Sequence, residues 1–299
     1  MSKTPAQSNY VGRFAPSPTG PLHMGSLVTA MASYLDAKKS DTPSSKWLIR
    51  IEDVDTPRTA VGATDQILRA LDVLGFEWDG QIIYQSERSE YYVAAIEELA
   101  ENQPDILFKC VCSRTEQPGL VYDGRCRSNR IGQHFAQATS IRLKVADNIQ
   151  WIDRSGLIFD ENLEKSCGDF VLKRRDNLWA YQLAVVVDDE LQGVTDIVRG
   201  KDLIDSTARQ IYLQTKLGYR HQSYWHVPLV LSASGEKLSK QTGARGLNLN
   251  AAVAELQTAW GYLNTQRIEA ITVNDFWHQA LERFARSDES AATTQPGPV

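Results

Sequence analysis

Long apolar runs and a secretory leader are both missing from this chain of 299 residues. No apolar stretch approaches the ~20 residues that a membrane-spanning helix needs. The N-terminus, MSKTPAQSNY, has no apolar core and therefore does not have the pattern of a signal peptide. We expect a cytoplasmic protein without membrane contact, long enough to form one large domain or two.

Cysteine is scarce, and the few that are present are not spread evenly. Three of the four cluster at Cys110, Cys112 and Cys126. In a reducing compartment such a cluster favours a metal site over a disulfide. Three thiolates are one ligand short of the tetrahedral set of structural zinc, and either His134 or Tyr122 could supply the fourth ligand.

An excess of positive charge is also absent, since 32 Lys and Arg face 37 Asp and Glu, for a net charge of −5. This balance weighs against non-specific binding of nucleic acid, although a local basic patch is enough for phosphate contacts. The candidate patches are Arg125, Arg127 and Arg130, and the run 173–175; each is more typical of a solvated face. No heptad pattern or exposed apolar stripe demands a partner, so a monomer is expected. No Ser-His-Asp set or carboxylate dyad is evident.

Strand and helix patterns alternate along the chain, which predicts an α/β fold with a doubly wound parallel sheet. Expected strands cover 11–14, 47–51, 141–145, 151–152, 183–187, 197–198 and 227–231. Expected helices begin at Leu22 and cover 60–74, 89–100, 206–217, 251–263 and 275–286. The predicted domain organisation is a flexible start (1–9), a sheet domain in two halves (10–102 and 176–240), an insertion between them (103–175), a short helical part (241–286) and a disordered tail (287–299).

The first motif, RFAPSPTGPLHMGS, runs from Arg13 to Ser26. Its prolines and glycines predict a tight, rigid turn that opens directly onto a helix. A helix N-terminus offers N–H groups and a partial positive charge, which suits a phosphate. A capped turn with a chance histidine would explain the motif alone. The candidate phosphate-binding residues are Pro16, Gly20, His23, Gly25 and Ser26.

The second motif, KLSK, runs from Lys237 to Lys240. By itself it is typical of a solvated surface loop. Two lysines in a mobile loop could instead close over a triphosphate and offset the charge that grows at the α-phosphate in the transition state.

Together the two motifs resemble the ATP-binding elements of class I aminoacyl-tRNA synthetases of the glutamyl branch. His23 to Ser26 take the HIGH position of that class, with Ser26 in place of the second histidine. The resemblance covers roughly residues 10–245 and includes LIRIEDVDTPR (48–58) and DIVRGKDLIDSTARQ (196–210). It implies a Rossmann-like catalytic domain in which Lys240 is the main ATP contact, assisted by Lys237, with Mg²⁺ accompanying ATP.

Glutamate activation requires a cation for the side-chain carboxylate and an anionic or polar group for the ammonium. Arg13 and Arg199 are suitable cations, and Glu52 is a suitable anion; all three follow or end expected strands, where open α/β sheets place ligands. Asp53 and Asp55 are equally well explained as helix caps. The resemblance implies a glutamate site made of Arg13, Ala15, Ser17, Glu52, Tyr181 and Arg199.

Only 59 residues follow Lys240, fewer than the anticodon-reading domain of a full-length glutamyl enzyme. The whole chain is similar to truncated paralogues of the glutamyl enzymes, in which Cys-x-Cys…Tyr-x₃-Cys binds zinc; this implies one structural Zn²⁺ on Cys110, Cys112, Tyr122 and Cys126. The resemblance implies ATP, L-glutamate and queuosine-containing tRNA(Asp) as partners, with glutamate attached to the modified anticodon base. A minimal enzyme charging tRNA(Glu) and an inactive glutamate- or RNA-binding protein are the alternatives.

Overall fold

The computed structural model describes residues 9–40, 42, 44–113, 115–116, 119, 121–230, 245–264 and 266–286. Lys237 and Lys240 of the second motif lie outside the described residues, as do 1–8 and the predicted tail at 287–299.

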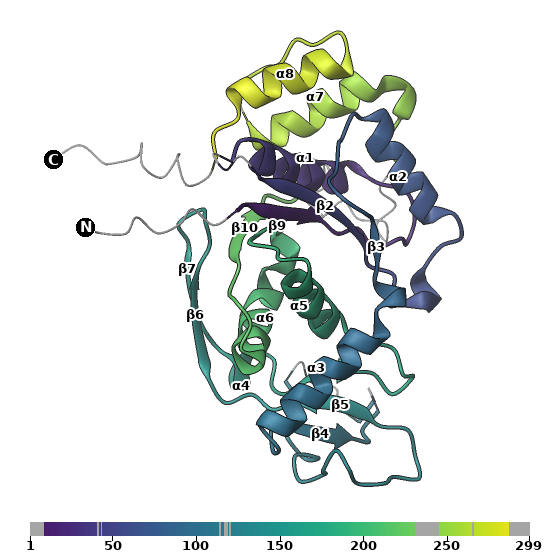
Figure 1. The fold of residues 1–299 in the computed structure, drawn as a ribbon, viewed down its shortest axis with the longest axis vertical. Helices are drawn as coiled ribbons and strands as arrows, with labels where there is room; N and C mark the ends of the chain where they lie inside the picture. Colours follow the sequence, from purple (N-terminus) through teal and green to yellow (C-terminus); the bar gives the residue numbers. More distant parts are fainter. Residues whose placement is uncertain are drawn as a thin grey trace, which may run out of the picture.

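A parallel sheet of five strands is the centre of the fold (Figure 1), in the order β10-β9-β1-β2-β3. Its strands are β1 (Val11–Phe14), β2 (Lys46–Ile51), β3 (Ile83–Tyr84), β9 (Asp196–Gly200) and β10 (Ser223–Val227). The chain leaves β1 toward β2 on one side, and β9 returns to its other side. This reversal opens a crevice at the carboxyl ends of β1 and β9.

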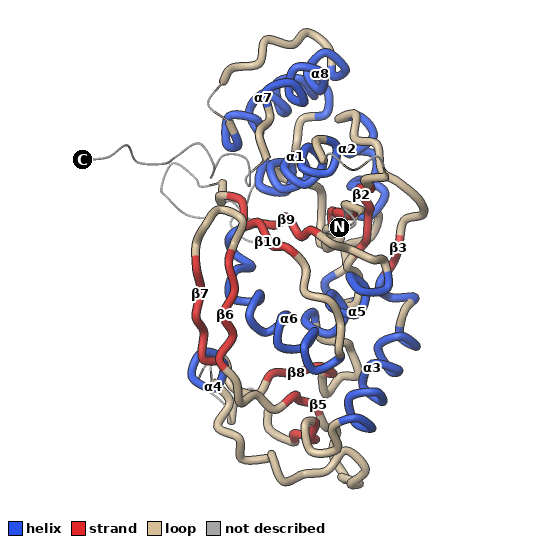
Figure 2. The backbone as a smooth tube through the Cα atoms, turned by 60° about the vertical axis from the view of Figure 1, so that its left-hand side comes forward, coloured by secondary structure: helices blue, strands red, loops and turns tan. Residues whose placement is uncertain are grey.

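Helices cover both faces of this sheet (Figures 1 and 2), as a doubly wound fold requires. One face carries α1 (Met24–Lys38), α2 (Ala63–Val73), α7 (Ala252–Leu263) and α8 (Val273–Arg283). The opposite face carries α5 (Tyr181–Leu191) and α6 (Ile204–Leu217), and α3 (Ser89–Asn102) packs against both. Short 3₁₀ turns cover Thr56–Arg58, Gln85–Glu87, Lys201–Leu203 and Leu249–Ala251. None of the described helices is long and apolar enough to cross a bilayer.

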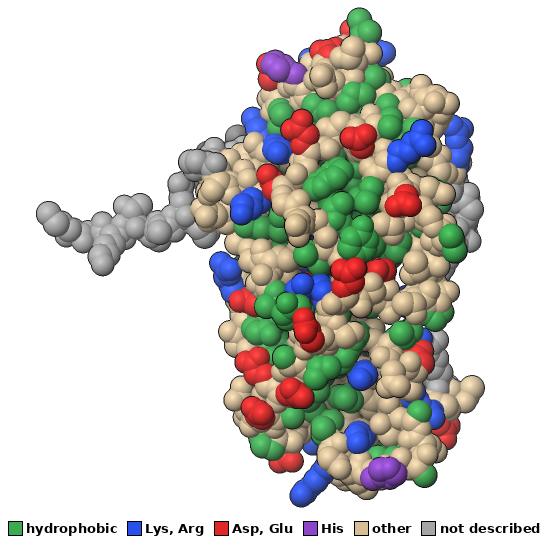
Figure 3. All heavy atoms as spheres, turned by 45° about the vertical axis from the view of Figure 1, so that its right-hand side comes forward, with side chains coloured by type: hydrophobic (Ala, Val, Ile, Leu, Met, Phe, Trp, Pro, Cys, Tyr) green, Lys and Arg blue, Asp and Glu red, His purple; other side chains and the backbone are tan. Residues whose placement is uncertain are grey.

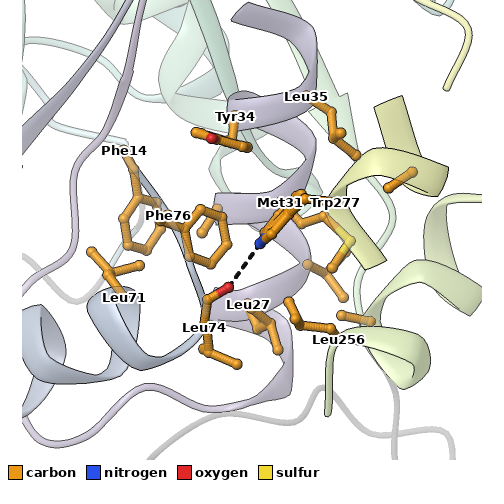
Figure 4. Close-up of a cluster of buried hydrophobic side chains, with 14 of the residues drawn as sticks. Phe14, Leu27, Met31, Tyr34, Leu35, Leu71, Leu74, Phe76, Leu256 and Trp277 are labelled. Carbon is orange, nitrogen blue, oxygen red and sulfur yellow. Dashed lines mark hydrogen bonds between the residues drawn. The ribbon is translucent and has the colours of Figure 1, made fainter. Parts of the chain in front are cut away.

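An aromatic cluster fastens the C-terminal helices to the sheet (Figure 4). Tyr34 of α1 makes edge contacts with Trp47, Phe76 and Trp277, at ring-centre distances of 5.1, 5.3 and 4.8 Å. The indole Nε1 of Trp277 donates to the carbonyl oxygen of Leu74 at 2.8 Å, so this buried polar group is satisfied. Residues more than 200 positions apart therefore share one core.

A smaller antiparallel part lies at the other end of the molecule. Strands β4 (Leu107–Cys110), β5 (Ser140–Leu143) and β8 (Phe170–Lys173) form one sheet, and β6 (Asn148–Ile152) pairs with β7 (Ile158–Asn162) ahead of the single-turn α4 (Leu163–Ser166). Three of the basic side chains here form ion pairs: Arg125 with Asp123, Arg127 with Asp169, and Arg174 with Asp176. On the face drawn in Figure 3, basic and acidic side chains are interspersed.

Two of the expected strands are wrong. The apolar run 183–187 is the middle of helix α5, and its five side chains are at most 1% exposed. A helix buried on all sides has no polar face, so its periodicity does not distinguish it from a buried strand. The strand expected over 227–231 is β10, which ends at Val227 and begins four residues earlier, at Ser223.

Candidate active site

The first motif forms the connection from β1 to α1. His23 is the N-cap of α1, and its Nδ1 accepts a hydrogen bond from the backbone N–H of Ser26 at 3.3 Å. Gly20 has φ of 143°, a backbone conformation that favours glycine. The helix N-terminus and its partial positive charge therefore lie directly beyond the turn.

A pocket of about 500 Å³ lies against this turn. The residues predicted to contact glutamate all line it, from four separate segments: Arg13, Ala15, Ser17, Glu52, Tyr181 and Arg199. Of the predicted ATP contacts, Pro16, His23, Gly25 and Ser26 also line it, whereas Gly20 is not among the lining residues. The carboxyl ends of β1, β2 and β9 meet at this edge of the sheet, which is why residues so far apart in sequence converge here.

Arg13 is held in place by a buried carboxylate that the sequence did not reveal. Its Nε donates to Oδ1 of Asp189 at 3.0 Å, and Nη1 of Arg50 donates to the same oxygen at 2.7 Å. Burial opposes ionisation of Asp189, but Arg13 and Arg50 together keep its pKa below the usual value. The carboxylate of Asp189 on α5 thus orients Arg13, which lines the pocket, and Arg50, which is not among the lining residues.

Glu52 follows the strand beside β1 and faces Arg50, whose Nη2 lies 3.5 Å from its Oε1. Burial raises the pKa of Glu52, while Arg50 and Arg13 act in the opposite direction. A buried carboxylate is costly to ionise because it has lost its hydration. The positive charge of a substrate ammonium would stabilise the ionised form and offset this cost. The ammonium contact of Glu52 stays a prediction.

Arg199 is buried, with its guanidinium fixed by three side chains. Nε donates to Nε2 of His226 at 3.1 Å, Nη1 to Oε1 of Gln210 at 2.6 Å and Nη2 to Oγ1 of Thr207 at 2.7 Å. A guanidinium has five N–H groups. These bonds with described residues leave one N–H on each terminal nitrogen for a ligand, the arrangement that suits a carboxylate.

A second pocket, of about 1000 Å³, shares Ser17, Thr19, Glu52 and Tyr181 with the first. Its other lining residues include four arginines and one aromatic side chain: Arg58, Arg142, Arg174, Arg175 and Trp179. The sequence did not predict this pocket. The only sequence feature that pointed to it was the basic run at 173–175. Asp55 also lines the pocket and pairs with Arg58 and Arg174, and its side chain makes no capping bond to the 3₁₀ turn that follows it. Asp53 accepts from the backbone N–H and the hydroxyl of Ser86, within the 3₁₀ turn Gln85–Glu87.

The clustered cysteines form a candidate metal centre at the edge of the second pocket. The Sγ atoms of Cys110, Cys112 and Cys126 lie within 4.8 Å of one another, and Cys112 lines the pocket. The Tyr122 hydroxyl accepts from the backbone N–H of Cys126 at 2.9 Å. Although burial opposes it, hydrogen bonds from Tyr122 and from the backbone of Cys112 lower the pKa of the Cys110 thiol to about 7.

Tyr122 is therefore the better placed of the two candidates for a fourth ligand. Burial and hydrogen bonds to Cys126 and Cys110 raise the pKa of its hydroxyl. His134 is exposed and does not belong to the ligand group formed by the described residues. Three clustered thiols, with a phenol oxygen hydrogen-bonded to two of them, fit a divalent ion that accepts sulfur ligands.

A family model described as the catalytic domain of class I tRNA synthetases (E and Q) matches residues 10–296. The chain belongs to this family. The chain is 48% identical over 290 residues to the glutamyl-Q tRNA(Asp) synthetase of Dechloromonas aromatica, covering 93% of this chain and 94% of that protein. It is 45% identical to the enzyme of the same name from Verminephrobacter eiseniae, covering 93% and 98%.

Among solved structures, this class I tRNA synthetase resembles a glutamate tRNA ligase from Elizabethkingia meningosepticum in complex with its amino acid. The TM-score is 0.68 at 27% identity, over 79% of this chain and 53% of that one. The chain thus spans about half the length of that protein. A methionyl-tRNA synthetase from Mycobacterium tuberculosis, at 12% identity and a TM-score of 0.53, shares the fold alone.

The described ends of the segment 231–244 of this synthetase both adjoin the smaller pocket. Val230 lines that pocket on one side of the segment. On the other side, Gly246 forms a bridge with His23, and the N–H of Leu247 donates to the carbonyl oxygen of Leu22 at 3.1 Å. The chain that carries KLSK therefore leaves and rejoins the described structure beside the first motif.

Proposed function

We propose that this protein activates L-glutamate with ATP and transfers the glutamyl group to queuosine in the anticodon of tRNA(Asp). The observation that carries the proposal is the smaller pocket, which is lined by Arg13, Arg199 and Glu52 together with residues at the start of α1. The names of its relatives, glutamyl-Q tRNA(Asp) synthetases, support the same acceptor.

In the first step the α-carboxylate of glutamate attacks the α-phosphate of ATP, an adenylate forms and pyrophosphate leaves. The carboxylate is already ionised at pH 7, so the site has only to align the reactants and stabilise the developing charge. His23 and the N–H groups at the start of α1 bind phosphate, and Mg²⁺ accompanies ATP as a charge clamp. Lys240, assisted by Lys237, supplies the remaining positive charge in this proposal.

In the second step a hydroxyl of the acceptor attacks the glutamyl carbonyl and AMP leaves. The acceptor has to approach through space that is continuous with the glutamate pocket, and the larger pocket meets this condition. Its arginines suit RNA phosphates, and Trp179 offers a surface for stacking a splayed base. We propose that residues 103–175 form the insertion that contacts the RNA from this side.

Two measurements test this function. Glutamate-dependent ATP–pyrophosphate exchange is expected without any tRNA, and labelled glutamate is expected on tRNA(Asp) that contains queuosine but not on tRNA(Asp) that lacks it. Label on the 3′ end of tRNA(Glu) instead would favour the minimal charging enzyme. Absence of both exchange and transfer would favour a protein that binds without catalysis.

We further propose that Cys110, Cys112, Tyr122 and Cys126 hold one structural Zn²⁺. Gly168 supports the backbone of Tyr122 so closely that a Cβ there would lie 2.7 Å from its N and 2.8 Å from its O. Gly168→Ala is therefore expected to displace Tyr122, reducing the bound zinc per chain and lowering Tm, because the contact cannot relax through a flexible side chain.

Gly193→Ala is the matched control for this prediction. Gly193 has φ of 66°, close to the 62° of Gly168, but a Cβ added at Gly193 would extend into open space. The substitution carries the same backbone cost without the clash. Equal zinc content in the two variants, measured by elemental analysis after gel filtration, would contradict the role assigned to Tyr122.

A further inference from the structure

A buried side-chain series, Asp153–His226–Arg199, lies behind the glutamate pocket. His226 of β10 is paired in register with Arg199 of β9, so the two side chains leave adjacent strands side by side. Arg199 lines the pocket, whereas His226 is not among the lining residues and is only 3% exposed. The histidine therefore contacts the cation that faces the substrate without facing the substrate itself.

The contacts of His226 specify a single protonation state. A guanidinium only donates, so Nε2 of His226 must accept the bond from Nε of Arg199 at 3.1 Å. The ring proton therefore resides on Nδ1, which lies 2.7 Å from Oδ2 of Asp153 and donates to it. Thr207 Oγ1, 3.1 Å from Nε2, accepts from Nη2 of Arg199 and has its own proton available for the histidine. Together with the bond from Arg199 to Gln210, these bonds use three of the five N–H groups of Arg199 and the Nδ1 proton of His226.

Asp153 is itself fixed before it orients the imidazole. Its Oδ1 accepts from the backbone N–H and the hydroxyl of Ser155 at 2.9 and 2.6 Å, and its Oδ2 also accepts from the backbone N–H of His226 at 3.0 Å. The residue follows β6, at the turn into β7, and is 1% exposed. The hairpin of the smaller antiparallel part thus ends directly behind the amino-acid pocket.

Burial, aided by the positive charge of Arg199, favours the neutral imidazole. Burial lowers the pKa of His226, and Arg199 acts in the same direction, against Asp153 and the more distant Asp202. The other titratable neighbour, Tyr224, stacks on the ring at 6.2 Å and has its own pKa raised to about 12 by burial. A protonated His226 would lose the acceptor for Arg199 and place two cations in contact.

We infer that His226 and Asp153 are positioning residues of the glutamate site. They hold the guanidinium of Arg199 so that its remaining N–H groups face the pocket as a carboxylate-binding fork. The inference rests on the proposed function, because it assigns Arg199 a carboxylate of the substrate. If the histidine had a purely structural role, its replacement would lower the stability of the protein without a selective effect on KM for glutamate.

Two amide substitutions at position 226 separate the bonds of the histidine. His226→Gln places an amide oxygen near the position of Nε2 and keeps an acceptor for Arg199. His226→Asn reaches only to the position of Nδ1, keeps a donor for Asp153 and leaves Arg199 without its acceptor. Asp153→Asn is the second variant: an amide donor toward Nδ1 would move the ring proton to Nε2, where it opposes Nε–H of Arg199.

The experiment measures KM for glutamate and for ATP in pyrophosphate exchange, together with Tm. His226→Asn and Asp153→Asn are expected to raise the glutamate KM by about 10- to 100-fold, the range of a lost hydrogen bond to a charged group, with the ATP KM within about twofold of wild type. His226→Gln is expected to lie closer to wild type than His226→Asn at a similar Tm.

Several outcomes would overturn the inference. These are an unchanged glutamate KM in His226→Asn, equal impairment of the Gln and Asn variants at equal Tm, or parallel increases in both KM values. The wild-type protein serves as the check on the proposed function: no glutamate-dependent exchange by wild type, with no glutamate binding by calorimetry, would overturn the function and the inference together. If the wild-type protein catalyses glutamate-dependent exchange and the variants have the same KM for glutamate, only the inference is overturned.

Discussion

Replacing Arg199 with alanine is expected to lower kcat/KM for glutamate in pyrophosphate exchange by about 10²–10³-fold, the effect of truncating one partner of a buried, hydrogen-bonded charge pair. The guanidinium is buried, is oriented by His226, Thr207 and Gln210, and lines the smaller pocket. Most of the loss is expected in KM for glutamate, because Arg199 is proposed to bind the amino acid in both the ground state and the transition state. KM for ATP is expected to change little, since the proposed phosphate site is at the start of α1.

Arg199→Lys distinguishes charge from geometry. Lysine keeps the positive charge but has no planar fork, so it is expected to recover only part of the lost activity. Arg267→Ala is the control, because Arg267 is 86% exposed and lies far along the chain in the C-terminal part. Wild-type exchange by Arg199→Ala would contradict the carboxylate-binding role of Arg199 and would leave Arg13 as the cation to test.

The sequence alone predicted the β1–α1 connection well, because its signals are local. Pro16, Pro18 and Gly20 define the turn, and an apolar stripe defines the helix that starts after His23. The predicted contacts Arg13, Glu52 and Arg199 needed more than local signals. Their charges and their places at strand ends made them candidates, and a resemblance that covers most of the chain implied the same three residues. The structure places all three around one pocket.

The groups that orient those contacts could not be predicted. Asp189 acts on Arg13 and Arg50, which are 176 and 139 residues away, and it lies on a helix whose apolar run was interpreted as a strand. Asp153 and His226 are 73 residues apart: Asp153 lies in the turn after β6, and His226 lies in β10 of the parallel sheet. No periodicity links such pairs, since their proximity is a consequence of chain topology.

The metal centre falls between these cases. The spacing of the three cysteines indicated a metal site, but it left the fourth ligand open between Tyr122 and His134. The choice depends on the turn that brings Tyr122 back to Cys126 and on the close approach of Gly168. Neither the turn at Tyr122 nor the close approach of Gly168 can be predicted from the sequence spacing of the ligands.

Replacing Asp189 with asparagine is expected to destabilise the protein by about 3–5 kcal/mol, the usual cost of leaving buried charges without their partner. The substitution keeps the shape but removes the anion that Arg13 and Arg50 share, and both guanidiniums are almost fully buried. Tm is expected to fall by about 6–20 °C for a chain of this size. Asp147→Asn is the matched control: the carboxylate of Asp147 is 51% exposed and 2.9 Å from Lys216, so a change within about 2 °C is expected.

The dependence of this effect on pH gives a second test. The pKa of Asp189 is lowered in the folded protein, so its stabilising contribution is complete above the unfolded-state pKa of about 4 and is lost as pH falls through the lower folded-state value. The difference in Tm between wild type and Asp189→Asn is therefore expected to be constant from pH 8 to about pH 5 and to narrow only below about pH 4. A difference that disappears near neutral pH would mean that Asp189 is protonated in the folded state and does not anchor Arg13 as an anion.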